Sequence, residues 1–111
     1  MKISVRKIGR ATILDLDGEI RFGKSENAVR QHVQDLVDAG TTQVAFNLAN
    51  VNDLDSTGIG VLVRSFASLN RAGGKCTFYA ANSRVRMLLK MVRLDTVLNL
   101  AEDEVAALSR L

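Results

Sequence analysis

The sequence predicts an α/β fold with a mostly parallel, mixed sheet of about five strands and four helices. Strand-like and helix-like patterns alternate from residue 11 to the end, which is typical of parallel strands joined by crossover helices. Two short alternating runs, joined by Gly9-Arg10, come first and indicate a hairpin that adds one antiparallel strand. A chain of 111 residues, 47% of them hydrophobic, fits one domain over residues 1–111.

The individual elements follow from periodicity and from their end signals. Strands are predicted at 3–8, 11–17, 42–48, 75–80 and 96–100. The first helix is expected to have Ser25 as its N-cap and to stop at Gly40, and the last helix opens with acids from Glu102. The apolar residues expected to face the core are Val29, Val33, Leu36 and Val37 in the first helix, Ile59, Leu62 and Phe66 in the second, Val85, Leu88, Leu89 and Val92 in the third, and Val105, Leu108 and Leu111 in the fourth.

Composition excludes several classes of function. No apolar run approaches the roughly 20 residues that span a bilayer, and the first ten residues lack the apolar block of a signal peptide, so we expect a cytoplasmic protein without membrane contact. A net charge of +3 with 5% aromatic residues argues against direct nucleic-acid binding. Cys76 is expected to be a buried thiol, and one cysteine with one histidine, His32, leaves no metal site and indicates no cofactor.

Residues 53–60, DLDSTGIG, carry the strongest functional signal. They lie where a strand turns into a helix, the place at which parallel sheets gather functional groups. Asp55 or Ser56 is expected to cap that helix. Gly58 and Gly60 each cost about 0.5–1 kcal/mol relative to alanine inside a helix. We therefore expect a surface free of side chains there, for close approach by another backbone or by a partner protein.

The face of this helix that starts at Ser56 is predicted to be exposed. Opposite the core positions it carries Thr57, Val61, Arg64 and Ser68. A phosphate on Ser56 would add a charge of about −1.5 to −2. The helix N-terminus favours that charge and the neighbouring aspartates oppose it on a similar scale, so we expect the fold to survive. A partner covering the phosphate would have to desolvate a dianion, so the stretch has the properties of a binding switch.

Four short segments make the chain similar to the STAS domain, named for sulphate transporters and anti-sigma factor antagonists. They are D-S-T-G-I-G at 55–60, DGE at 17–19, GGK at 73–75 and NSRVRMLL at 82–89. The chain resembles most the free-standing bacterial anti-sigma factor antagonists, over roughly residues 3–108. The resemblance implies a single STAS-like domain with no catalysis of its own.

What the resemblance implies further is partner switching. The unphosphorylated protein would bind an anti-sigma factor that is itself a serine kinase and so release the sigma factor. Phosphorylation of Ser56 would break that complex, and a serine phosphatase would restore it. We expect a monomer or weak dimer. The residues expected to contact the partner are Asp55, Thr57, Gly58, Gly60, Val61, Arg64 and Arg21.

Arg21 departs from the family pattern. The turn reads DGEIR at 17–21, whereas the family commonly has an acid at the last position. Two interpretations stay open: Arg21 is a solvated turn residue, or it pairs with a phosphate on Ser56 or on a bound nucleotide.

A competing motif overlaps this turn. Residues 18–25, GEIRFGKS, match the phosphate-loop pattern and would make the chain a small nucleotide-binding or hydrolysing protein using Gly18, Gly23, Lys24 and Ser25. The bulky interior and the negative charge of Glu19 disfavour a phosphate cradle. A further alternative keeps the STAS fold but drops phosphorylation, as a scaffold subunit.

Two other features have both a plain and a functional interpretation. His32 is expected to be a helix-flank residue rather than a catalytic base. The third helix carries a basic stripe of Arg86, Lys90 and Arg93 beside two methionines, Met87 and Met91. It is either a solvated face or a secondary contact for an acidic partner.

Overall fold

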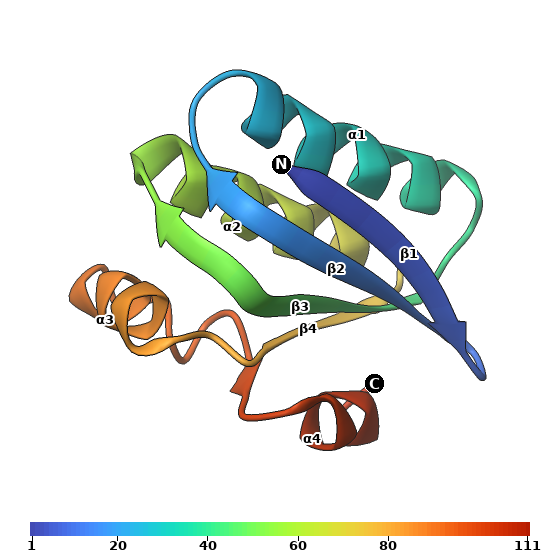
Figure 1. Cartoon of the computed structure of the whole chain (residues 1–111). Coiled ribbons are helices and arrows are strands. Elements are labelled where there is room, and N and C mark those ends of the chain that lie inside the picture. Colours follow the sequence, from blue (N-terminus) through green and yellow to red (C-terminus); the bar gives the residue numbers. More distant parts are fainter.

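The computed structural model describes residues 1–111, which form a five-stranded sheet and four helices (Figure 1). In chain order the elements are β1 (Lys2–Ile8), β2 (Ala11–Ile20), α1 (Lys24–Asp38), β3 (Gln43–Leu54), α2 (Ser56–Arg71), β4 (Lys75–Tyr79), α3 (Ser83–Met91), β5 (Leu100–Ala101) and α4 (Glu104–Ser109). The strands lie in the order β1-β2-β3-β4-β5. β1 pairs antiparallel with β2, and every other pair is parallel. The predicted fold class is therefore confirmed.

The two faces of the sheet are covered unequally. The larger core cluster holds 18 buried residues, which come from the sheet, α1, α2 and α3, with Leu98 from the α3–β5 connection. A smaller cluster of five buried residues lies on the other face under α4. Crossovers of one hand between sequential parallel strands leave their helices on the same face. This explains why α1, α2 and α3 share one core, whereas α4, which follows the last strand, covers the opposite side.

Three strands differ from their predicted bounds by more than one residue. β2 continues to Ile20 instead of ending at residue 17. β3 continues to Leu54 instead of ending at residue 48, because its second half pairs with the end of β2 through two register shifts. Its exposed asparagines hide the alternation that would have revealed this extension. Residues 96–99 form turns, and only Leu100–Ala101 pairs with β4. As a result β2 and β3 end side by side, with Ile20 opposite Leu54, at the start of α2.

Three expectations about the helices are wrong. The N-cap of α1 is Gly23, with φ +104° and no side-chain cap, because the Ser25 hydroxyl instead exchanges hydrogen bonds with the backbone of Arg21. Val92 lies just past the end of α3 and is 50% exposed. Val105 is 78% exposed, because the short helix α4 packs on the sheet through Ala107. None of the four helices is both long enough and apolar enough to cross a bilayer.

Candidate functional site

The candidate site lies where β2 and β3 end and α2 begins. Ser56 is the first residue of α2 and its side chain is exposed, as the sequence predicted. Asp55 is the N-cap: one carboxylate oxygen accepts from the backbone N–H of Gly58 at 2.7 Å and the other from that of Phe22 at 2.9 Å. These two backbone donors lower the pKa of Asp55 below its ordinary value. Asp55 thus ties the β2–α1 connection to the first turn of α2 and leaves the Ser56 hydroxyl free to be reached.

Glycine is required at position 58 by a backbone contact within the chain. A Cβ atom there would stand 2.0 Å from the carbonyl oxygen of Ile20, so only glycine lets α2 approach the end of β2. Gly58 is buried, and its predicted place on an exposed partner surface is wrong. The expected close approach is made by another backbone of the same molecule. Gly60 differs, because a Cβ there would meet only the guanidinium of Arg64 at 3.2 Å.

The exposed face of α2 is narrower than predicted. Val61 is 1% exposed and belongs to the main core, so its assignment as a partner-contacting residue is wrong. The cause is α1, which packs beside α2 and buries the stripe that contains Val61. Arg64 remains exposed, with its guanidinium 3.7 Å from Glu26 of α1, and Thr57 is half-buried. On the predicted face, Ser56 and Arg64 are therefore exposed, and Thr57, Gly60 and Ser68 are half-buried.

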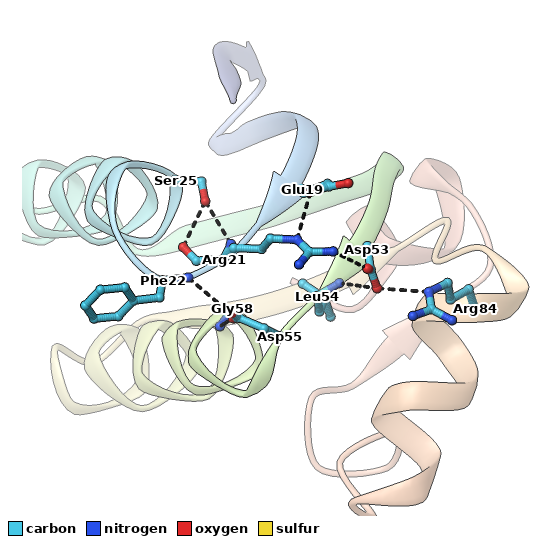
Figure 2. A network of polar contacts seen from close by, with 9 residues as sticks. All are labelled: Glu19, Arg21, Phe22, Ser25, Asp53, Leu54, Asp55, Gly58 and Arg84. Atoms are coloured by element: carbon cyan, nitrogen blue, oxygen red, sulfur yellow. Dashed lines mark hydrogen bonds and ion pairs between the residues drawn. The ribbon is translucent and has the colours of Figure 1, made fainter.

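Arg21 belongs to a network of charged side chains at the ends of β2 and β3 (Figure 2). Its guanidinium lies 2.6 Å from Asp53 and 2.8 Å from Glu19. The other carboxylate oxygen of Asp53 accepts from Arg84 of α3 at 2.9 Å. These contacts, with that of Arg84 the strongest, lower the pKa of Asp53. Arg21 is thus more than a solvated turn residue, because Asp53 joins the β2–α1 connection to the first turn of α3.

Segment 18–25 does not form a phosphate cradle. Its first three residues are strand, with Gly18 opposite Val51 of β3. The Ser25 hydroxyl donates to the carbonyl of Arg21 at 2.9 Å and accepts from its N–H at 2.8 Å. A loop whose first part is committed to the sheet cannot wrap its N–H groups around an anion.

Two residues near Ser56 have no counterpart in the sequence prediction. Phe22 is 80% exposed, although its backbone N–H is fixed by Asp55; in Figure 2 its ring extends to the left, away from Asp55 and Arg21. An isolated aromatic in a turn carries no periodic signal. Arg84 was missed because it lies 28 residues along the chain from Ser56, and only the fold brings its helix beside the end of β3.

The remaining candidates lie elsewhere and show no reactive chemistry. The Nδ1 atom of His32 lies 2.9 Å from the carbonyl of Ala28, one turn earlier in α1. Cys76 is buried in β4, and burial raises the pKa of its thiol. No three or more His, Cys, Asp or Glu residues are grouped so that they could hold a metal ion.

Residues 2–107 match the STAS domain family, so the chain belongs to that family. Among named relatives it is similar to an anti-sigma F factor antagonist of Paenibacillus polymyxa, with 27% identity over 99 residues, covering 89% of this chain and 85% of that protein.

Two solved structures show the same fold. One is a putative anti-sigma factor antagonist from Thermotoga maritima, with a TM-score of 0.89 and 20% identity over 97% of this chain and 92% of that one. The other is the Bacillus cell fate determinant SpoIIAA in its phosphorylated form, with a TM-score of 0.74 and 18% identity over 98% of both chains.

Proposed function

We propose that this protein is an anti-sigma factor antagonist whose hold on its partner is switched by phosphorylation of Ser56. The observation that carries the proposal is the exposed Ser56 hydroxyl at the first residue of α2, with the exposed Phe22 on the neighbouring β2–α1 connection. A modifying enzyme can reach this oxygen, and a docked protein would cover it. The partner is an anti-sigma factor with serine kinase activity, and a serine phosphatase reverses the modification.

The names of similar proteins support the same reading. The Paenibacillus relative is called an anti-sigma F factor antagonist. SpoIIAA, which shares the fold, has a structure described as its phosphorylated form. An antagonist of this kind acts by binding another protein. We therefore propose that the chain has no catalytic activity of its own.

The charges around Ser56 explain how a phosphate could act on binding without unfolding the domain. The free N–H groups at the start of α2 attract an anion, whereas Asp55 and Asp53 repel it. These opposed effects are each of modest size at an exposed position, so the fold is retained. A partner that covered the phosphate would have to remove water from a dianion without supplying a matched cation, and the complex would dissociate.

The roles of the neighbouring residues follow from their exposure and contacts. Asp55 shapes the loop through its two backbone hydrogen bonds. Thr57, Gly60 and Arg64 provide accessible surface on α2. Arg21, held by Glu19 and Asp53, presents a cation at the rim of the same surface.

The first test identifies the partner and the modification together. Unphosphorylated protein on a column is used to capture proteins from the native extract, and the anti-sigma factor recovered is incubated with free protein and ATP. Intact-mass analysis should show one added phosphate, which Ser56→Ala abolishes and Thr57→Ala retains. The phosphorylated form should no longer bind the captured protein.

Two results would count against the proposal. Unchanged phosphate incorporation in Ser56→Ala would remove Ser56 as the acceptor. Equal affinity of the phosphorylated and unphosphorylated forms for the partner would leave a constitutive scaffold in place of a switch.

A further inference from the structure

Helix α3 presents a second surface that the fold does not use. Met87 is 50% exposed and Met91 72% exposed, and they lie one turn apart. Beside them on the helix lie two exposed cations, Arg86 and Lys90, and a third, Arg93, lies in the turn just after the helix; none of the three forms an ion pair. We call these five residues the α3 face.

The α3 face is not needed to hold α3 on the sheet. The buried side of the helix consists of Val85 and Leu89. At 100° per residue Arg86 and Lys90 share one side of the helix and Met87 and Met91 the adjoining side, both turned away from the buried stripe. Arg86, Met87 and Lys90 also line a shallow groove with residues 81–83, where the chain leaves β4 and enters α3. The fold leaves apolar and cationic groups together on one exposed surface, part of which borders this groove.

Two side-chain contacts place the start of α3 beside the end of β3, the strand that leads into Ser56. The Asn82 side chain donates to the carbonyl of Val51 at 3.0 Å. Arg84 donates to Asp53 at 2.9 Å, a contact that Figure 2 shows. Both anchors lie in the last four residues of β3, directly before α2. A protein docked on Ser56 therefore has the first turn of α3 within its reach.

We propose that the α3 face binds an acidic segment of the same partner, one that carries carboxylates next to apolar side chains. This inference rests on the proposed function, because it takes the captured anti-sigma factor as that partner. Unpaired cations attract carboxylates and steer association. Flexible methionine side chains adapt their shape to apolar groups. Phosphorylation of Ser56 would then disrupt one part of the contact while the α3 face sets which partner is chosen.

The same residues fit a membrane or a nucleic acid less well. Amphipathic helices that lie in membranes usually bury Trp, Phe or Leu, whereas the exposed apolar groups here are two methionines on a helix of nine residues. Nucleic-acid surfaces combine a larger basic patch with stacking aromatics, and the α3 face has no aromatic residue. A protein segment is the occupant that uses both the charges and the methionines.

The test is charge reversal with a matched control. Arg86→Glu/Lys90→Glu alters the α3 face. Lys7→Glu/Arg10→Glu makes the same change of charge at the end of β1 and in the β1–β2 turn, at the opposite end of the sheet from Leu54 and Ser56. Affinity for the captured anti-sigma factor is measured by calorimetry at several salt concentrations. The first variant should bind at least ten-fold more weakly, with a flatter salt dependence, and the control should bind within two-fold of wild type. Both should unfold at the wild-type temperature.

The outcomes separate this inference from the proposed function. If Arg86→Glu/Lys90→Glu binds like wild type while Ser56 phosphorylation still abolishes binding, the α3 inference is overturned and the switch stands. If the variant is ten-fold weaker but phosphorylation has no effect, the switch fails and the α3 inference stands. Binding of wild type, but not of the variant, to phosphatidylglycerol vesicles or duplex DNA at 0.15 M salt, with unchanged affinity for the anti-sigma factor, would overturn it in favour of those ligands.

Discussion

Gly58 lies where the first turn of α2 comes closest to the end of β2, and its missing Cβ makes room for the carbonyl oxygen of Ile20. Gly60, two residues later, faces only the exposed head of Arg64. The sequence gives both glycines the same cost inside a helix. Their surroundings in the structure differ: Gly58 is needed for the packing of α2 on β2, whereas Gly60 lies at the surface.

Alanine substitutions should separate these two roles. Gly58→Ala forces the backbones of α2 and β2 apart and should lower the free energy of unfolding by about 1–3 kcal/mol. Gly60→Ala only displaces a flexible side chain and gains helix propensity, so it should raise that free energy by up to about 0.5–1 kcal/mol. Urea denaturation measures both. A loss in Gly60→Ala as large as in Gly58→Ala would contradict the assignment.

Phe22 is expected to act on binding and not on folding. Its ring is 80% exposed, so Phe22→Ala should change the free energy of unfolding by less than about 0.5 kcal/mol. Large aromatics that become buried on binding often dominate an interface, and we expect at least ten-fold weaker affinity for the captured anti-sigma factor. Val105→Ala removes a similarly exposed apolar side chain on α4 and should bind normally. Equal affinities of the two variants would exclude Phe22 from the interface.

Local sequence signals located the reactive part of the site but not its surroundings. Ser56 and Asp55 could be predicted because a hydroxyl and a capping carboxylate before a helix are local patterns. Arg84 could not, since its contact with Asp53 crosses 31 residues and depends on where α3 packs. Phe22 could not either, because nothing in a turn sequence says whether an aromatic ring points inward.

At the scale of the element, α2 shows why a buried stripe can be misplaced. The prediction centred the core on Ile59, Leu62 and Phe66, of which Ile59 and Phe66 are only partly buried. The buried positions of the helix are Gly58, Val61, Leu62, Ser65 and Leu69. Ser65 fits in this stripe because its hydroxyl donates to the Val61 carbonyl at 2.6 Å. A glycine and a serine in the stripe hide it from a search for apolar periodicity.

Asn82 is expected to control the placement of α3. Its side-chain oxygen accepts from Val85 N–H at 2.9 Å, and its amide donates to Val51 of β3. Asn82→Ala removes the cap and the anchor and should lower the free energy of unfolding by about 1–2 kcal/mol. Asn82→Ser keeps a capping oxygen but not the anchor, so its loss should be smaller.

Hydrogen exchange of the α3 amides, followed by NMR, tests whether the loss of stability is confined to α3. Exchange should accelerate in α3 more than in α1 when Asn82 is replaced by alanine. Ser83→Ala, one residue later, removes a side chain with no hydrogen-bond partner and serves as the control. If Ser83→Ala destabilises the protein as much, the capping role of Asn82 is refuted.

At the scale of the whole molecule, the order of elements was enough to predict the fold class. Alternating strands and helices left few topologies, and the sequential strand order is the simplest of them. The position of α4 on the opposite face of the sheet was harder to predict, because a helix of six residues carries little hydrophobic periodicity. Besides the apolar packing of Ala107, a polar cluster that joins the two ends of the chain ties α4 to the sheet.

That cluster is centred on Arg6 of β1. Its guanidinium lies 2.5 Å from Asp15 of β2 and 2.6 Å from Glu104 of α4. Tyr79 of β4 donates to the same Glu104 oxygen at 2.7 Å, and Asn47 of β3 donates to Asp15 at 2.8 Å. Side chains from four strands and one helix thus meet in one polar cluster around Arg6 and Asp15. Burial, and then the bond to Glu104, raise the pKa of the Tyr79 hydroxyl, which therefore stays protonated as the donor.

The cluster should make the stability of the whole domain depend on acid pH. Hydrogen bonds from Arg6 lower the pKa of Asp15 below 3.8 and that of Glu104 below 4.5. The folded state therefore binds fewer protons than the unfolded chain in this range. The stabilising contribution of the cluster is complete above about pH 5. It is lost as the pH falls through the pKa values that Asp15 and Glu104 have in the folded state.

Arg6→Met keeps the aliphatic stem but removes the cation, and it should weaken this pH dependence. Arg6 is 42% exposed, so water screens its pairs, and we expect a loss of about 1 kcal/mol at pH 7. Below pH 4 the difference from wild type should shrink as both carboxylates become protonated. Urea denaturation between pH 3 and 7 measures it, with Arg10→Met, which removes an unpaired exposed cation, as the control. Parallel curves for Arg6→Met and wild type would show that α4 and the sheet are held together without this charge cluster.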